Sequence, residues 1–180
     1  MCAFYSLLAA HMLLDVRTAA ASKVLIIGDS NAEYSGTSLE KFCPGVTVKN
    51  AAVADSTAVQ WTSGDWLDRI GTQACGGPPD FIWLSVGAND LLGSKCTNTV
   101  DKLAAKITAS INAVKAKAPT AKILLMGYCV PASSPHSDCD TPQKMQTLLT
   151  AQRRAADADA SVTVIDSTTA CGGSVTAWSP

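Results

Sequence analysis

Runs of apolar residues separated by polar turns divide the chain into alternating strands and helices. Val24 to Ile27 and Asp80 to Val86 are apolar almost throughout, which is typical of parallel strands buried on both faces. The pattern predicts three further strands, at 46–53, 121–128 and 162–165.

Helical periodicity is strongest from Thr99 to Ala118. Apolar residues recur there at steps of three and four, the lysines fall largely off that stripe, and Pro119 ends the pattern. Other helices are predicted within 37–42, 59–70 and 143–158, and 31–36 is predicted to be a polar loop. This alternation favours right-handed crossovers and one doubly wound α/β domain with a parallel five-stranded sheet.

Composition narrows the class of protein. A length of 180 residues suits one domain, and 47% hydrophobic with 16% charged residues is typical of a globular chain. The net charge of −1 gives no electrostatic footprint for nucleic acid. Because no apolar run reaches the roughly 18 residues needed to cross a bilayer, we expect no transmembrane segment. We also expect a monomer.

The first 21 residues form a distinct segment. Ala3 to Leu14 is mostly apolar, and the small residues of 18–22 suit a signal peptidase, so residues 1–21 resemble a secretory signal. No Lys or Arg precedes the apolar run, and the other reading is an amphipathic N-terminal helix. Cysteine content favours secretion, and residues 22–180 are then the mature domain.

Six cysteines follow Cys2, and their number is the even one that three disulfides require. Six cysteines allow 15 connectivities, so the pairing does not follow from the sequence. Cys129 and Cys139, which bracket a loop, are the first pair that we expect. Free buried thiols are the other reading.

Polar residues follow each of the first three strands. If the strand order is 2-1-3-4-5, the carboxyl ends of these strands meet at one crevice, which is where open α/β sheets bind ligands. Ser30 follows the first strand, Asp55 the second and Asn89 the third. Ser30 is a candidate nucleophile; its N–H, the Asp55 N–H and the Asn89 amide are candidate oxyanion donors. Asp29 and Ser30 are also ordinary turn and helix-capping residues.

Two of these blocks resemble a known family. Gly28-Asp29-Ser30 and Gly87-Ala88-Asn89-Asp90 are similar to the first and third blocks of the SGNH hydrolases, also called the GDSL esterase/lipase family, and the resemblance covers roughly residues 23–167. It implies a flavodoxin-like, three-layer α/β/α fold and hydrolysis of acyl esters of lipids or acetylated carbohydrates. It implies Ser30 as nucleophile and oxyanion donor and Asn89 as side-chain donor. No metal or organic cofactor is implied.

The second block departs from the family pattern. The position of the family's glycine falls on Asp55. The Asp55 N–H can still donate, since every residue except proline has one, but its carboxylate would oppose a nearby oxyanion. The other reading is that Asp55 caps the following helix.

The general base is the larger departure. The family takes it from a late Asp-x-x-His block, and the sequence, which ends at Pro180, contains none. We expect a chain truncated at its C-terminus. His136, after the fourth strand, is a candidate replacement, against an ordinary surface histidine. A serine hydroxyl without a base is a poor nucleophile, so the full-length product is expected to be an esterase and this chain nearly inactive.

Two functions of other classes compete with the hydrolase. In the first, the crevice holds a carbohydrate or acyl group without cleaving it, as a pseudoenzyme that lacks the catalytic histidine. In the second, a flavodoxin-like domain binds a nucleotide or flavin. The second is disfavoured because the loop after the first strand lacks a glycine-rich or Ser/Thr-rich phosphate cradle.

Overall fold

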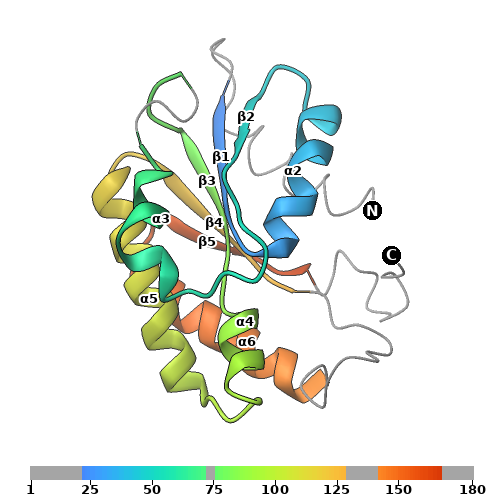
Figure 1. Ribbon diagram of the computed structural model, residues 1–180, viewed down its shortest axis with the longest axis vertical. Helices are drawn as coiled ribbons and strands as arrows, with labels where there is room; N and C mark the ends of the chain where they lie inside the picture. Colours follow the sequence, from blue (N-terminus) through green and yellow to red (C-terminus); the bar gives the residue numbers. More distant parts are fainter. Residues whose placement is uncertain (1–21, 72–75, 129–141, 168–180) are drawn as a thin grey trace.

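The computed structural model describes residues 22–71, 76–128 and 142–167, which form strands and helices in alternation (Figure 1). In chain order the elements are β1 (Lys23–Gly28), α2 (Ser30–Phe42), β2 (Thr47–Asn50), the 3₁₀ helix η1 (Gln60–Thr62), α3 (Asp65–Asp68), β3 (Phe81–Ser85), α4 (Ala88–Gly93), α5 (Val100–Lys117), β4 (Lys122–Met126), α6 (Pro142–Ala156) and β5 (Val162–Ile165).

The five strands pair in the order β2-β1-β3-β4-β5, and every pair is parallel. This confirms the predicted α/β class and strand order. β1 lies between β2 and β3, so the chain reverses direction across the sheet at β1, and the carboxyl ends of β2, β1 and β3 lie next to one another. The three candidate residues follow these ends.

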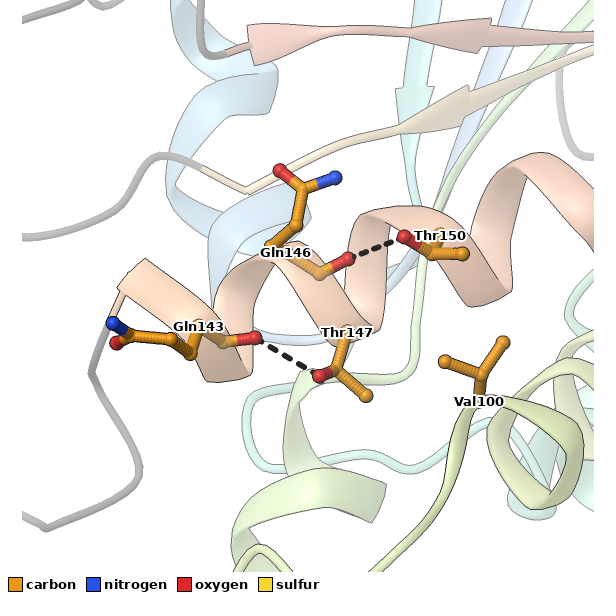
Figure 2. Close-up of a pocket in the computed structure, with 5 residues that line it drawn as sticks. All are labelled: Val100, Gln143, Gln146, Thr147 and Thr150. Atoms are coloured by element: carbon orange, nitrogen blue, oxygen red, sulfur yellow. Dashed lines mark hydrogen bonds between the residues drawn. The ribbon is translucent and has the colours of Figure 1, made fainter.

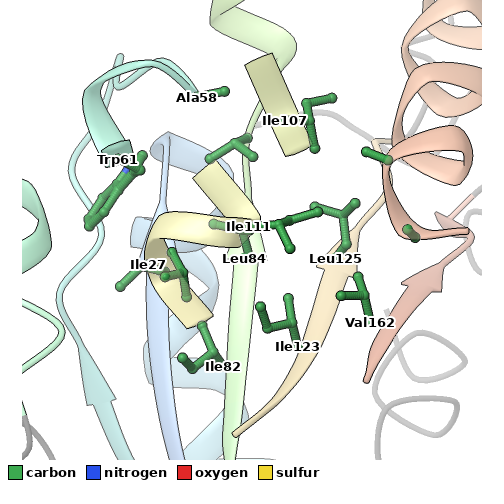
Figure 3. Close-up of a cluster of buried hydrophobic side chains, with 14 of the residues drawn as sticks. Ile27, Ala58, Trp61, Ile82, Leu84, Ile107, Ile111, Ile123, Leu125 and Val162 are labelled. Carbon is green, nitrogen blue, oxygen red and sulfur yellow. The ribbon is translucent and has the colours of Figure 1, made fainter. Parts of the chain in front are cut away.

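Helices cover both faces of the sheet (Figure 1). Alternate residues of β1, β3 and β4 point to one face, where they pack against η1, α5 and α6; Figure 3 shows this cluster, with Ile107 and Ile111 above Leu84 and Leu125. The other residues of these strands pack against α2 through Ala32 and Leu39. Because both faces are covered, β1 and β3 are buried along almost their whole length, which explains their unbroken apolar runs.

Two local predictions were wrong. Residues 31–36, predicted to be a loop, belong to α2, because Asp29 caps the helix directly before Ser30. The single helix expected over 59–70 is instead two short pieces, η1 and α3, separated at Gly64. Gly64 has a φ of +63°, which a continuous right-handed helix cannot include.

Cys43 is free and buried, so the reading in which all six cysteines pair is wrong. The side chain lies at the C-terminal end of α2 and packs beside Val24 and Leu39, where it acts as a small apolar group. Burial raises the pKa of the Cys43 thiol.

Several predictions fall on residues outside the described part of the chain, and they stay predictions. These are the signal-like segment 1–21 and the positions of His136, Cys75, Cys129, Cys139 and Cys171. Within the described part of the chain, no helix has the length and apolar character needed to cross a bilayer.

Replacing Gly28 by Ala should destabilise the fold strongly. Gly28 has a φ of +127°, and a Cβ built there would lie 2.1 Å from the main-chain oxygen of Ser85. The substitution therefore adds backbone strain and forces β1 and β3 apart. We expect the free energy of unfolding to fall by about 3 kcal/mol or more, measured by urea denaturation.

Gly45→Ala is the matched control. Gly45 also has a positive φ, +91°, but no atom of the described residues lies within 4 Å of the added Cβ. Only backbone strain remains, so we expect a loss of about 1 kcal/mol. Equal losses in the two variants would mean that the close approach of Gly28 to Ser85 adds no constraint.

Candidate active site

Ser30 is the first residue of α2, and two interactions of Asp29 hold it at the end of β1. The Asp29 side chain accepts the Asn31 N–H at 3.1 Å and so caps the helix. The Asp29 N–H donates to the main-chain oxygen of Ser85 at 3.0 Å, which joins this turn to the end of β3. Ser30 is partly exposed, and its hydroxyl makes no hydrogen bond within the described residues.

Asp55 lies in a tight turn after β2. The turn is closed by the Ser56 N–H, which donates to Val53 O at 3.3 Å, and the Val53 N–H donates to Gly28 O at 2.9 Å. The Glu33 carboxylate of α2 accepts the Ala54 N–H at 2.9 Å. These bonds hold the turn beside the beginning of α2, where Ser30 lies.

The backbone conformation at position 55 explains why an aspartate can replace the glycine that the family has there. Its φ is +61°, in the left-handed region that favours glycine and that aspartate tolerates better than most residues. The Asp55 side chain is exposed, and its N–H makes no hydrogen bond within the described residues. The alternative that Asp55 caps the following helix is wrong. That helix, η1, begins at Gln60, its capping residue is Val59, and no side chain caps it.

Asn89 is the second residue of α4, directly after β3. Its Nδ2 donates to Ser56 O at 2.9 Å, so the amide is fixed against the turn that contains Asp55. An amide nitrogen carries two hydrogens. One is donated to Ser56 O, and the other makes no hydrogen bond within the described residues.

Main-chain and side-chain bonds thus join three loops at one edge of the sheet. The first is the start of α2 with Ser30, the second is the turn with Asp55, and the third is the start of α4 with Asn89. At such an edge a hydroxyl can attack a carbonyl carbon, and neighbouring N–H donors can bind the resulting oxyanion. His136, the candidate base, is outside the described residues.

The comparisons with known proteins decide the family. The sequence profile of the GDSL-like lipase/acylhydrolase family matches residues 26–180. The chain belongs to this family. No functionally curated protein matches the chain by sequence.

Solved structures share the GDSL fold. An extracellular lipase from Streptomyces rimosus has a TM-score of 0.59 at 15% identity, with 89% of this chain and 86% of that chain covered. The acetylxylan esterase Axe2 of Geobacillus stearothermophilus has a TM-score of 0.55 at 16% identity, with 85% of this chain and 80% of that chain covered. A Streptococcus pneumonia protein provisionally described as a platelet activating factor has a TM-score of 0.62 at 22% identity, with 91% of this chain and 73% of that chain covered. The family match, together with the shared fold, supports an acyl hydrolase function of the esterase/lipase type.

A buried polar network surrounds the side chain of Asp29, the residue directly before Ser30. Ser85 Oγ donates to Asp29 Oδ1 at 3.1 Å, and the Tyr128 hydroxyl donates to Asp29 Oδ2. Burial raises the pKa of Asp29, and the hydrogen bonds from Tyr128 and Ser85 offset only part of this rise, so the pKa is about 6. Burial, followed by the charge of Asp29, raises the pKa of Tyr128 well above its ordinary value. The network ties the ends of β1, β3 and β4 together.

Sequence reasoning missed Ser85 and Tyr128 as parts of this edge, and it assigned no role to Asp90, which it named only as part of the block after β3. The weak signal for Ser85 is a hydroxyl inside the apolar run of β3. Tyr128 is 99 residues from its partner Asp29, so no local spacing could have linked them.

A hollow of about 470 Å³ between α5 and α6 is separate from this edge (Figure 2). Val100, Gln143, Gln146, Thr147 and Thr150 line it. The two threonine hydroxyls bond to main-chain oxygens one turn earlier in α6, as the dashed lines in Figure 2 show. None of the three candidate residues lines the hollow. No metal-binding group of three or more His, Cys, Asp or Glu side chains occurs in the described residues.

Asp29 should make the folded protein less stable as pH rises. Its folded pKa of about 6 exceeds the ordinary 3.8, so between these values the folded state holds a proton that the unfolded state has released. Asp29→Asn removes this titration. We expect the free energy of unfolding of the wild type, minus that of the variant, to fall by about 2 kcal/mol from pH 4 to pH 7 in urea denaturation.

Asp159→Asn provides a control of opposite sign. Hydrogen bonds from Lys115 and Ser161 lower the pKa of Asp159 to about 2, so its stabilising effect is nearly complete above pH 4 and is lost as the pH falls from about 4 to 2. The corresponding difference should be nearly flat from pH 4 to pH 7. A flat or rising difference for Asp29→Asn would show that burial does not dominate at Asp29.

Proposed function

We propose that this protein is a serine ester hydrolase in which Ser30 forms an acyl-enzyme. Ser30 Oγ attacks the ester carbonyl carbon, and the carbonyl oxygen takes the negative charge. Collapse of this intermediate expels the alcohol, and water then releases the carboxylic acid from Ser30. The observation that carries the proposal is the set of bonds that joins the start of α2 to the turn after β2 and to α4.

Three donors are proposed to stabilise the oxyanion. They are the Ser30 N–H at the beginning of α2, the Asp55 N–H and the second hydrogen of Asn89 Nδ2. The left-handed backbone of Asp55 supports its role, because it turns the main chain as glycine can while the exposed side chain remains in solvent. An exposed carboxylate is screened by water, which reduces its repulsion of the oxyanion.

The Ser30 proton requires a general base. His136 is the candidate in this chain, and it follows β4, whose carboxyl end lies on the same edge of the sheet. Triad enzymes that lack a base retain only the slow catalysis provided by binding and the oxyanion hole.

The proposed substrates are acyl esters of lipids or of acetylated carbohydrates. Two exposed apolar side chains support an acyl group of some length: Tyr34 is 71% exposed and lies one turn after Ser30, and Leu92 is 38% exposed and lies one turn after Asn89. The similar structures include both a lipase and an acetylxylan esterase.

The second candidate function is binding of the same acyl or carbohydrate group without cleavage. It is favoured by the Ser30 hydroxyl, which has no basic partner within the described residues. The following experiment separates the two candidates.

Ser30→Ala should abolish ester hydrolysis. If His136 supplies the base, the wild type should release nitrophenolate from 4-nitrophenyl acetate or octanoate, and the variant should be at least about 10³-fold slower, because the nucleophile is lost. If this chain lacks a base, the wild type should be nearly inactive as well. A fluorophosphonate should label Ser30 in the wild type, as read by peptide mass spectrometry. A parallel His136→Ala variant tests the base: a similar loss supports His136, and unchanged turnover eliminates it.

A wild type that neither turns over nor reacts with the phosphonate would contradict the hydrolase. Saturable binding of a fatty acid or an acetylated xylo-oligosaccharide in calorimetry, together with that inertness, would favour the binding protein.

Asn89→Ala should lower kcat about 10²- to 10³-fold with little change in KM, because it removes a donor to the oxyanion. Asn112→Ala is the control, since Asn112 is an exposed amide on α5. Thermal melting of both variants checks folding. A kcat of Asn89→Ala close to that of the control would exclude Asn89 from the catalytic machinery.

A further inference from the structure

We infer that Asp90 and Lys106 form a positioning pair for the oxyanion donors. The inference rests on the proposed function, because it concerns how the turn with Asp55 and the amide of Asn89 keep their places. Neither Asp90 nor Lys106 is proposed to touch the substrate.

Asp90 connects α4 to the segment that directly follows the Asp55 turn. Its Oδ2 accepts the Ala58 N–H at 2.7 Å, and Ala58 is fully buried. Next to it, Asn89 Nδ2 donates to Ser56 O at 2.9 Å. Two consecutive residues of α4 therefore hold one short segment, 56–58, through one acceptor and one donor. If either bond were lost, the distance between the proposed donors could change.

The buried charge of Asp90 requires compensation. The Asp90 side chain is only 1% exposed, and Lys106 Nζ of α5 lies 3.2 Å from its Oδ1. This contact is an ion pair without hydrogen-bond geometry, since Oδ1 has no hydrogen-bond partner among the described residues. A buried carboxylate without a partner is costly, and a negative charge adjacent to Asn89 would also oppose the oxyanion.

Lys106 can therefore serve catalysis without reaching the substrate. It comes from α5, the long helix that packs against η1 and α6, and its side chain is 36% exposed. Asn98 adds a bond to the main chain of Asp90, because its Nδ2 donates to Asp90 O at 2.9 Å. The main chain and the carboxylate of Asp90 are thus held independently.

The test is a double-mutant cycle measured by kcat, KM and melting temperature. Asp90→Ala should lower kcat roughly 10- to 100-fold with KM within about twofold, because the turn loses its tie. Asp90→Asn should recover most of this loss, since an amide oxygen still accepts the Ala58 N–H. Lys106→Met should lower kcat about tenfold in the wild type, but less than about twofold in the Asp90→Asn background, where no charge remains to be compensated.

Lys115→Met is the matched control, because it removes another α5 lysine from another ion pair, that with Asp159. Its kcat should equal that of the wild type. An equal effect of Lys106→Met in both backgrounds would overturn the charge compensation. A kcat of Asp90→Ala within twofold of the wild type would overturn the positioning role.

Amide hydrogen exchange of Ala58 separates this inference from the proposed function. The exchange of Ala58 should be faster in Asp90→Ala and close to the wild-type rate in Asp90→Asn, whether or not the protein hydrolyses esters. Unchanged exchange in Asp90→Ala would overturn the tie itself. Failure of the Ser30 experiments with this exchange pattern intact would overturn the hydrolase and leave Asp90 as the residue that shapes a binding crevice.

Discussion

The contact between the ends of β1 and β3 is the constraint on which the rest of the site depends. Gly28 is paired with Ser85, and its missing side chain lets the two main chains approach closely. The Asp29 N–H then bonds to Ser85 O, and α2 begins at the next residue. This contact sets the direction in which α2 leaves the sheet and hence the position of Ser30.

Two buried carboxylates stand directly beside the residues proposed to perform the chemistry. Asp29 precedes Ser30 and binds Ser85 and Tyr128; Asp90 follows Asn89 and binds Ala58. Burial of a carboxylate is costly unless its oxygens have partners. Asp29 accepts hydrogen bonds on both oxygens, whereas Asp90 accepts one on Oδ2 and pairs with Lys106 through Oδ1. The edge therefore combines exposed groups that can meet a substrate with a rigid polar layer beneath them.

Prediction succeeded where the physics is local or periodic. The long helix α5 was clear because its apolar stripe repeats over 18 residues and Thr99 caps it. β1 and β3 were clear because both their faces are buried. It failed at 31–36 and 59–70, where one cap and one positive φ decide whether a helix begins or breaks. These are single-residue effects that an average over a window of sequence conceals.

By itself, the sequence determined the alternation of strands and helices, the apolar faces and the identity of the polar residues that follow each strand, because these depend on neighbours a few positions apart. Tertiary structure alone decided their partners: Tyr128 with Asp29, 99 residues away, and Ala58 with Asp90, 32 residues away. Such pairs form only after the parallel strands align. No periodicity records them, because a hydrogen bond depends on distance in space and not on distance along the chain.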